Sequence, residues 1–113
     1  MYILIFYVPE SHLERVKNAV FKAGAGAIGD YSRCSWQVKG TGQFQPGEQS
    51  SPFLGSRGSL EEIPEYRVEV ACPDERVEDI AGAFLREHPY EEPAHHFMKV
   101  KSASELTGSG DAG

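Results

Sequence analysis

The sequence predicts an α+β fold of the ferredoxin-like type, a split βαβ-βαβ arrangement in which a four-stranded antiparallel sheet carries two helices on one face. Two observations support this prediction. When the chain is shifted so that Tyr2 overlies Tyr66, apolar residues coincide through a strand, a proline and an amphipathic helix. In both copies a further strand pattern then follows the helix. The repeat predicts the order of elements only, because this fold hosts many functions.

The first copy begins with an apolar stretch, YILIFYV, at residues 2–8. Because both alternating faces of this stretch are apolar, we expect a central strand that is buried on both sides. Pro9 ends the strand and suits the first turn of a helix. One apolar stripe predicts that helix: Leu13, Val16, Val20 and Ala23. A second strand is expected over residues 28–38, with Cys34, Trp36 and Val38 on one face.

The second copy begins at residues 66–72, where apolar residues alternate with Arg67 and Glu69. This pattern is typical of a strand with one solvated face. Pro73 takes the place of Pro9, and a second apolar stripe predicts the following helix: Val77, Ile80, Ala81 and Phe84. A last strand is expected over residues 94–100.

The composition indicates a single domain over residues 1–101 and a small, polar tail, residues 102–113, that we expect to be flexible. The formal net charge of −6 and the lack of a Lys/Arg cluster in the sequence disfavour nucleic-acid binding. No apolar run approaches the ~20 residues of a membrane helix, and the apolar start lacks the basic leader of a signal peptide. Cys34 and Cys72 lie far apart, so we expect no disulfide and a cytoplasmic location.

Between the two copies, residues 39–64 are rich in Gly, Ser and Pro and form a predicted arm loop. A structureless loop of this length would be unusual in a compact domain. The stretches GTGQF and SLEEI match short strands, and five apolar residues are candidate anchors: Phe44, Phe53, Leu54, Leu60 and Ile63. Two interpretations are open. The arm packs on a neighbouring subunit or closes over a ligand, or it is a disordered insertion.

The stretch GAGAIG, residues 24–29, matches the letters of a dinucleotide-binding fingerprint. That fingerprint must follow a strand and open a helix, whereas this stretch follows a helix and precedes a strand. The position instead favours the end of a helix, with Gly24 in the left-handed conformation.

The stretch HPYEEPAHHF, residues 88–97, is the densest group of polar candidates. The residue before a proline avoids the helical region, so the second helix should end near His88. A protonated imidazole is favoured at that position by the helix dipole. The same stretch offers ligands for a divalent metal: His88, Glu91, His95 and His96. Neighbouring strand residues point to opposite faces, so His95 and His96 could share one ion only through a bulge or a second chain.

No catalytic constellation can be assembled from the sequence. Ser/His/Asp and Cys/His sets are not specified, and adjacent Glu91 and Glu92 should diverge along an extended chain. His12 is expected to be exposed, and Tyr31 and Trp36 are interpreted as packing residues. We therefore expect no enzymatic activity.

An ordered set of motifs resembles the YqfO-type domain that is inserted in Nif-three-like dinuclear metal-centre proteins and also exists as short free-standing proteins. The resemblance covers roughly residues 1–100 and includes the following positions: Val8, Pro9, Glu10, Gly24 to Gly26, Ile28, Gly29, Tyr31, Cys34, Ser35, Gly40 to Gly42, Phe44, Pro46, Pro52, Phe53, Gly55 and His88 to Glu91. The HPYE-x-P motif is also similar to that of the CutA proteins, whose trimeric ferredoxin-like fold is related to the PII signalling proteins.

The resemblance implies a PII/CutA-like domain that forms a homo-oligomer, with a trimer favoured. It does not carry over the dinuclear metal site, because those ligands lie on the flanking halves of the larger proteins. The family commonly has an aromatic residue near His95, so the resemblance does not support His95 and His96 as shared ligands.

We therefore expect a non-enzymatic oligomeric binding or sensor module of undetermined ligand. A protein-interaction module and a divalent-metal-binding protein with an inter-subunit site are the alternatives. The ligand or interface candidates are His88, Tyr90, Glu91, Glu92, Phe44 and Phe53.

Overall fold

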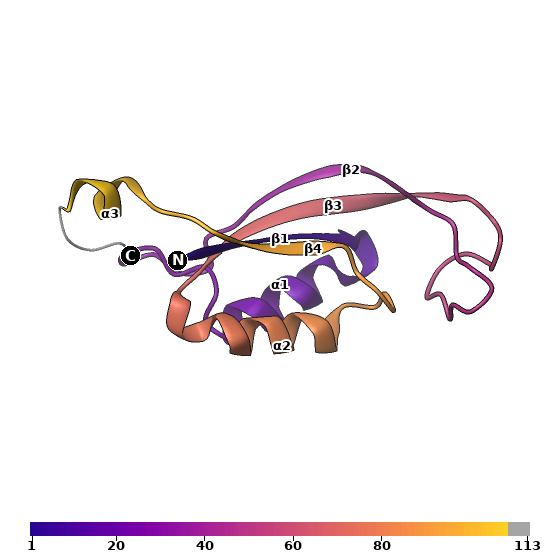
Figure 1. The fold of residues 1–113 in the computed structure, drawn as a ribbon, viewed down its shortest axis with the longest axis horizontal. Coiled ribbons are helices and arrows are strands. Elements are labelled where there is room, and N and C mark those ends of the chain that lie inside the picture. Colours follow the sequence, from indigo (N-terminus) through magenta and orange to yellow (C-terminus); the bar gives the residue numbers. More distant parts are fainter. Residues whose placement is uncertain (109–113) are drawn as a thin grey trace.

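The computed structural model describes residues 1–108 and confirms the predicted ferredoxin-like fold (Figure 1). Its elements follow one another in this order: β1 (Tyr2–Pro9), the 3-10 turn η1 (Glu10–His12), α1 (Leu13–Lys22), β2 (Trp36–Phe44), β3 (Glu61–Cys72), the 3-10 turn η2 (Asp74–Arg76), α2 (Val77–Glu87), β4 (His95–Lys99) and α3 (Ala103–Thr107). No helix within residues 1–108 has the length and apolar character needed to cross a membrane.

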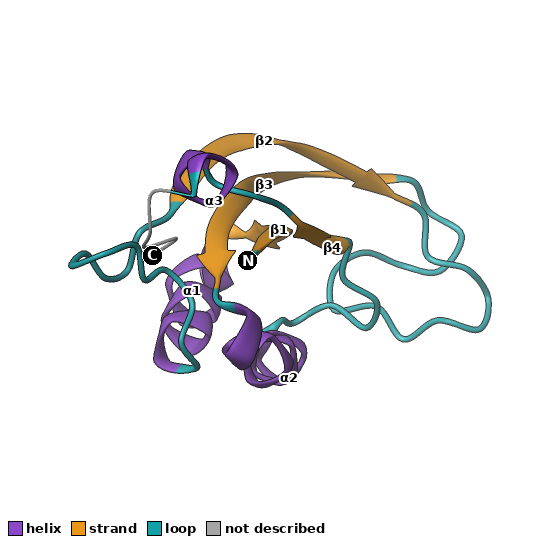
Figure 2. Ribbon diagram, turned by 60° about the vertical axis from the view of Figure 1, so that its left-hand side comes forward, coloured by secondary structure: helices purple, strands orange, loops and turns teal. Residues whose placement is uncertain are grey.

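The four strands form one antiparallel sheet in the order β2-β3-β1-β4, so β1 is a central strand as predicted. Helices α1 and α2 lie side by side on one face of this sheet (Figures 1 and 2). The hairpin of β2 and β3 runs on beyond the ends of the other strands, and the molecule extends 53 Å along its longest axis.

The core lies between the sheet and the two helices. Alternate residues of β1, Leu4, Phe6 and Val8, are fully buried against the helices. The rings of Phe6 and Phe84 are 5.3 Å apart between centroids, which joins the central strand to α2. The remaining buried residues come from the predicted helix stripes and from the inner face of β3: Leu13, Val16, Val20, Val68, Val70, Cys72 and Ile80.

The internal repeat is visible as two equivalent strand-to-helix turns. Each strand ends near a proline, and each helix is preceded by a single 3-10 turn, η1 in the first copy and η2 in the second. The end of α1 is then fixed by the second copy, because the Arg76 side chain donates a hydrogen bond from Nε to the carbonyl of Ala23 at 3.0 Å.

The opposite face of the sheet, here called the open face, carries neither α1 nor α2, and its Tyr7 end lies beside the arm-loop segment and Tyr90. Its apolar residues include Ile3, Ile5, Tyr7, Trp36, Val38, Ile63, Ala71 and Met98. Trp36 is 57% exposed and Met98 is 50% exposed. The prediction that β1 is buried on both sides is confirmed for the helix-facing side and in part for the open face, where Ile5 is 9% exposed and Ile3 and Tyr7 are half-buried. Helices α1 and α2 both lie on the other side of the sheet (Figure 2).

The start of the second strand was predicted too early. Residues 24–34 form turns instead of a strand, and β2 begins only at Trp36. Four residues here have positive φ, which interrupts an extended chain: Gly24, Gly26, Gly29 and Arg33. Gly24, with φ of +118°, directly follows the end of α1, which confirms the helix-terminus interpretation of GAGAIG.

The predicted arm loop is shorter than residues 39–64. Strand β2 continues to Phe44 and β3 already begins at Glu61, so the segment outside the strands is residues 45–60. The two short stretches GTGQF and SLEEI thus belong, in whole or in part, to the long hairpin, which pairs Phe44 with Glu61 at its tip. We call residues 45–60 the arm loop from here on.

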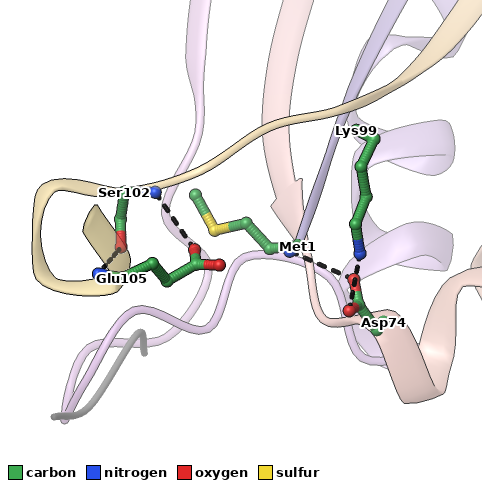
Figure 3. Close-up of polar contacts among 5 residues, drawn as sticks. All are labelled: Met1, Asp74, Lys99, Ser102 and Glu105. Atoms are coloured by element: carbon green, nitrogen blue, oxygen red, sulfur yellow. Dashed lines mark hydrogen bonds and ion pairs between the residues drawn. The ribbon is translucent and has the colours of Figure 1, made fainter. Parts of the chain in front are cut away.

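Residues 103–107 of the predicted flexible tail form the short helix α3. Ser102 caps this helix: its hydroxyl accepts the amide N–H of Glu105 at 3.3 Å, and the Glu105 carboxylate accepts the amide N–H of Ser102 at 3.0 Å (Figure 3). The sequence pattern S-x-x-E is typical of such a capping box. Residues 109–113 of the predicted tail lie outside the described part of the chain.

At the same end of the sheet, Asp74 joins three segments (Figure 3). Its carboxylate pairs with the Lys99 ammonium at 2.7 Å and with the Met1 ammonium at 3.1 Å. The hydrogen bond from Lys99, followed by that from Met1, holds the pKa of Asp74 below its ordinary value. Exposed pairs of this kind contribute little stability, so they set the register of β4 beside η2 rather than hold the fold together.

The core predicts a sharp contrast between two neighbouring residues of α2. We expect Phe84→Ala to lower the free energy of unfolding by about 3–5 kcal/mol, because it opens a cavity beneath β1. Leu85 is 58% exposed, so Leu85→Ala should change it by no more than ~0.5 kcal/mol. Urea denaturation followed by circular dichroism measures both. Equal losses for the two variants would contradict this account of the core.

Candidate functional site

The candidate site lies at the end of the sheet where β1 and β4 stop while the β2–β3 hairpin continues. There the arm loop turns back toward residues 88–94, the link between α2 and β4 (Figure 1). The backbone N–H of Ser51 donates to the Glu91 carboxylate at 3.0 Å. The Phe53 ring stands edge-on to His12 with centroids 5.2 Å apart, and it lies 6.4 Å from the Tyr90 ring. Segments far apart in the sequence therefore meet here.

Internal hydrogen bonds give the arm loop a defined shape. Pro46 accepts from the amide of Gly58 at 2.6 Å, and the Arg57 side chain donates to the carbonyl of Ser50 at 2.7 Å. The Ser50 hydroxyl closes a turn by donating to the Gly47 carbonyl at 2.7 Å. Together with the contacts to Tyr90 and Glu91, these bonds hold the arm loop against its own domain.

A cavity of about 360 Å³ separates the arm loop from the body of the domain. Its size falls within the range of small-molecule sites. The lining combines aromatic, amide and carboxylate side chains, and includes Tyr7, Gln43, Phe44, Phe53, Glu65, Tyr90, Glu91 and Glu92. Five of the six predicted ligand or interface residues thus line one space, namely Phe44, Phe53, Tyr90, Glu91 and Glu92.

The inner end of the cavity is organised by a hydrogen bond between β3 and the 88–94 link. The Tyr90 hydroxyl donates to the Glu65 carboxylate at 2.6 Å. Burial, and then this bond with the negative charge of Glu65, raise the pKa of Tyr90 far above its ordinary value, so the phenol stays neutral. The other Glu65 oxygen lies over Gly42, where a side chain would collide with it. Glycine on β2 therefore leaves room for this carboxylate.

His88, the sixth candidate, lies behind the cavity instead of in it. Its side chain is buried, with the residue 6% exposed, and both ring nitrogens have partners. Nδ1 accepts the backbone N–H of Tyr90 at 3.1 Å, which leaves Nε2 to donate to the Tyr7 carbonyl at 2.6 Å. Burial lowers the pKa of this imidazole below its ordinary value. The expectation of a protonated histidine stabilised by the helix dipole is therefore wrong, because Nδ1 can accept the Tyr90 amide only when it carries no proton.

The candidate metal ligands are not brought together in one chain. His95 faces the helices, with its ring 4.7 Å from that of Phe84, whereas His96 is exposed on the open face. This divergence was predicted from strand geometry. Among residues 1–108 no group of three or more His, Cys, Asp or Glu side chains is arranged to hold a metal ion. His88 has already used both ring nitrogens in hydrogen bonds.

Two other expectations are corrected. His12 is half-buried under Phe53 and not exposed, because the arm loop folds back over η1. Tyr31 and Trp36, interpreted as packing residues, are 76% and 57% exposed within the single chain. The sequence analysis also missed Tyr7, Gln43 and Glu65. These three residues come together with Tyr90 only at the end of the folded sheet, so no local sequence motif identifies them.

Comparisons with known proteins agree with this structure. No family model matches the chain. It is 38% identical over 113 residues to a Halalkalibacterium halodurans protein named GTP cyclohydrolase 1 type 2 homolog, covering 100% of this chain and 30% of that one. A Mycobacterium leprae protein of the same name is 52% identical over 90 residues, or 80% of this chain and 23% of that one.

A crystal structure of a Bacillus cereus protein related to NIF3 overlays with a TM-score of 0.76 at 35% identity, covering 89% of this chain and 26% of that one. The chain is homologous to a segment of the Nif-three-like proteins. The PII-like protein CutA from Nostoc sp. shares the fold, with a TM-score of 0.64 at 16% identity over 94% of this chain and 85% of that one. Both resemblances predicted from the sequence are confirmed. The chain spans less than a third of these two curated Nif-three-like relatives.

The buried His88 predicts a specific pH dependence of stability. In the unfolded chain its imidazole titrates near 6.5, and burial lowers that pKa in the folded chain. As the pH falls below about 6.5, the unfolded state takes up the proton first, so the free energy of unfolding falls until the folded pKa is reached. We expect this slope to become shallower in His88→Gln, whose amide still donates to Tyr7, and to persist in the exposed control His96→Gln. Urea denaturation between pH 7.5 and 5 measures it.

An NMR titration of the wild-type imidazoles provides a check that does not depend on the variant. A pKa for His88 at or above 6.5 would contradict the buried neutral ring.

The ring contacts of Phe53 predict how the arm loop is held. Phe53→Ala removes the contacts with His12 and Tyr90, so the amide of Ser51 should exchange with solvent roughly three- to tenfold faster. Leu60, 60% exposed in the same loop, provides the matched control, and Leu60→Ala should leave this rate unchanged. Hydrogen exchange followed by NMR distinguishes them. An unchanged rate in Phe53→Ala would show that the ring does not hold the loop.

Proposed function

We propose that this domain is a non-enzymatic, homo-oligomeric binding or sensor module that takes a small molecule into the cavity beneath the arm loop. The observation that carries the proposal is the cavity itself. Four distant segments build it, from β1, the hairpin, the arm loop and the 88–94 link. Hydrogen bonds fix two of those segments to one another through Glu65 and Tyr90.

The side chains at the cavity support binding over catalysis. Tyr90 is held neutral and already donates its proton to Glu65. His88, behind the cavity, has both ring nitrogens in backbone hydrogen bonds and is not free to transfer a proton. Cys72 is buried in the core, where burial raises the pKa of its thiol to about 11, so it is not an activated nucleophile.

The open face supports self-association. Apolar side chains from all four strands share it, and a patch of this kind is typical of an interface. We propose that copies of this chain pack through the open face, and that the assembly is a trimer, as the resemblance to CutA proteins implies. Both cysteines are free, in keeping with a cytoplasmic location as part of the proposal.

The test is native mass spectrometry of gently purified protein, which reports subunit number and bound species together. We expect a trimer that retains a small molecule. Met98→Glu places a charge on the open face and should give folded monomers, because burying an unpaired charge opposes association. Leu85→Glu introduces the same charge on the exposed side of α2 and should leave the trimer intact.

A wild-type protein that is monomeric at micromolar concentration would contradict the assembly. Dissociation by Leu85→Glu but not by Met98→Glu would move the interface to the helices.

An interaction module is the second candidate, favoured by the exposed edge of the sheet. Strand β2 pairs only with β3 among the described strands, and most of its residues are exposed. Such an edge can accept a further strand from another protein. If the same experiment finds one copy of the chain bound to a protein partner and to no small molecule, the interaction module is favoured over the small-molecule module.

A further inference from the structure

The cavity beneath the arm loop carries negative charge. Glu65, Glu91 and Glu92 all line it, and no lysine or arginine of residues 1–108 is among its lining residues. Glutamate side chains are ionised at neutral pH. None of the three forms an ion pair with a described residue, although cationic side chains neutralise other carboxylates of this chain, such as Glu14 and Asp79. The charged side chains that line the cavity are therefore all carboxylates.

Glu65 is the most informative of the three carboxylates. It is half-buried, and its partner is a neutral hydroxyl instead of a cation. A charge that is partly removed from water without an opposite charge raises the free energy of the folded chain. Its position is nevertheless well defined, because Tyr90 fixes one oxygen and the space above Gly42 receives the other. The site is thus shaped around an unpaired negative charge.

Aromatic rings surround this charge. The Phe44 and Tyr90 rings are 6.1 Å apart and inclined at 48°, and the Phe53 and Tyr90 rings are 6.4 Å apart and inclined at 47°. Tyr7 lines the same space. A cation that contacts the face of one of these rings is attracted by its negative charge density, as it is by carboxylates.

We propose that the cavity binds a small organic cation, an ammonium or guanidinium group carried on an apolar or planar body. The cationic group lies near Glu65 with Glu91 or Glu92 beside it, and the apolar body packs between Phe44, Phe53 and Tyr90. This inference rests on the proposed binding function and names its ligand class. It also excludes from this cavity a nucleotide triphosphate, because no cationic side chain is present there to neutralise the phosphates.

The test uses three probes of similar size and different charge, together with GTP. Benzyltrimethylammonium is the cation, benzyl alcohol the neutral probe and benzenesulfonate the anion. Each is titrated into the folded full chain, and backbone amide shifts are followed by NMR. We expect saturable shifts with the cation alone, at residues 43–54 and 90–94. Raising the ionic strength from 0.05 to 0.5 M should weaken binding.

Charge-neutral variants locate the cation. Glu65→Gln keeps an oxygen that accepts from Tyr90, and should weaken cation binding by roughly three- to tenfold. Glu14→Gln is the matched control, since Glu14 is a carboxylate exposed on α1 and away from the cavity, and it should leave the affinity unchanged. Equal weakening by both variants would overturn the assignment to this cavity.

The failure of the ligand class and the failure of the binding function are separable. If benzyl alcohol, benzenesulfonate or GTP binds at these residues as tightly as the cation does, the cavity is a binding site but the proposed class is overturned. The class is also overturned if no probe binds while native mass spectrometry finds a retained small molecule that carries no ammonium or guanidinium group. No probe and no retained molecule would overturn both proposals.

Discussion

The hydrogen-bonded imidazole of His88 is the constraint on which the candidate site depends. Its Nε2 proton holds the carbonyl of Tyr7 near the end of β1, and its Nδ1 lone pair holds the amide of Tyr90. This fixes the route of the chain as it leaves α2 and brings the Tyr90 hydroxyl to Glu65. The ring is buried beside Phe84, which is itself packed on Phe6, so the cavity wall is anchored in the hydrophobic core. Packing and polar geometry therefore determine the site together.

The sequence predicts the repeated part of this fold well and the unique part poorly, for physical reasons. Strand alternation and helix stripes are local patterns, so β1, α1 and α2 were found close to their observed positions, and β3 was found from Tyr66 onward although it begins at Glu61. Residues 28–35 were mistaken for the start of a strand because the alternation of Cys34, Trp36 and Val38 was extended back over them, whereas the positive φ angles of Gly29 and Arg33 interrupt an extended chain there. The helix α3 was missed because the tail was predicted from its small, polar composition, whereas the capping box of Ser102 and Glu105 starts a short helix there.

In the candidate site too, residues that are adjacent in the sequence were predicted, and residues brought together by the fold were not. The HPYEE stretch was recognised as a group, since its residues are adjacent in sequence. Its closest partners, Glu65 and Tyr7, come from strands whose register is set by pairing over the whole sheet. His88 was assigned the wrong protonation state because burial and the hydrogen bond from the Tyr90 amide keep it neutral. Neither feature can be inferred from the sequence. Chemistry that depends on tertiary register lies beyond what a motif can specify.

Tyr7 connects the proposed ligand site with the proposed interface between copies of the chain. Its side chain lines the cavity and belongs to the open face, while its carbonyl is held by His88. A second copy packed on the open face would therefore share a wall with the ligand. Two events that contact one residue are coupled whenever either changes its position, and such coupling is reciprocal: a ligand that stabilises the assembly is bound more tightly by the assembly. Under the proposed function, this coupling lets the domain report a bound molecule through its state of association.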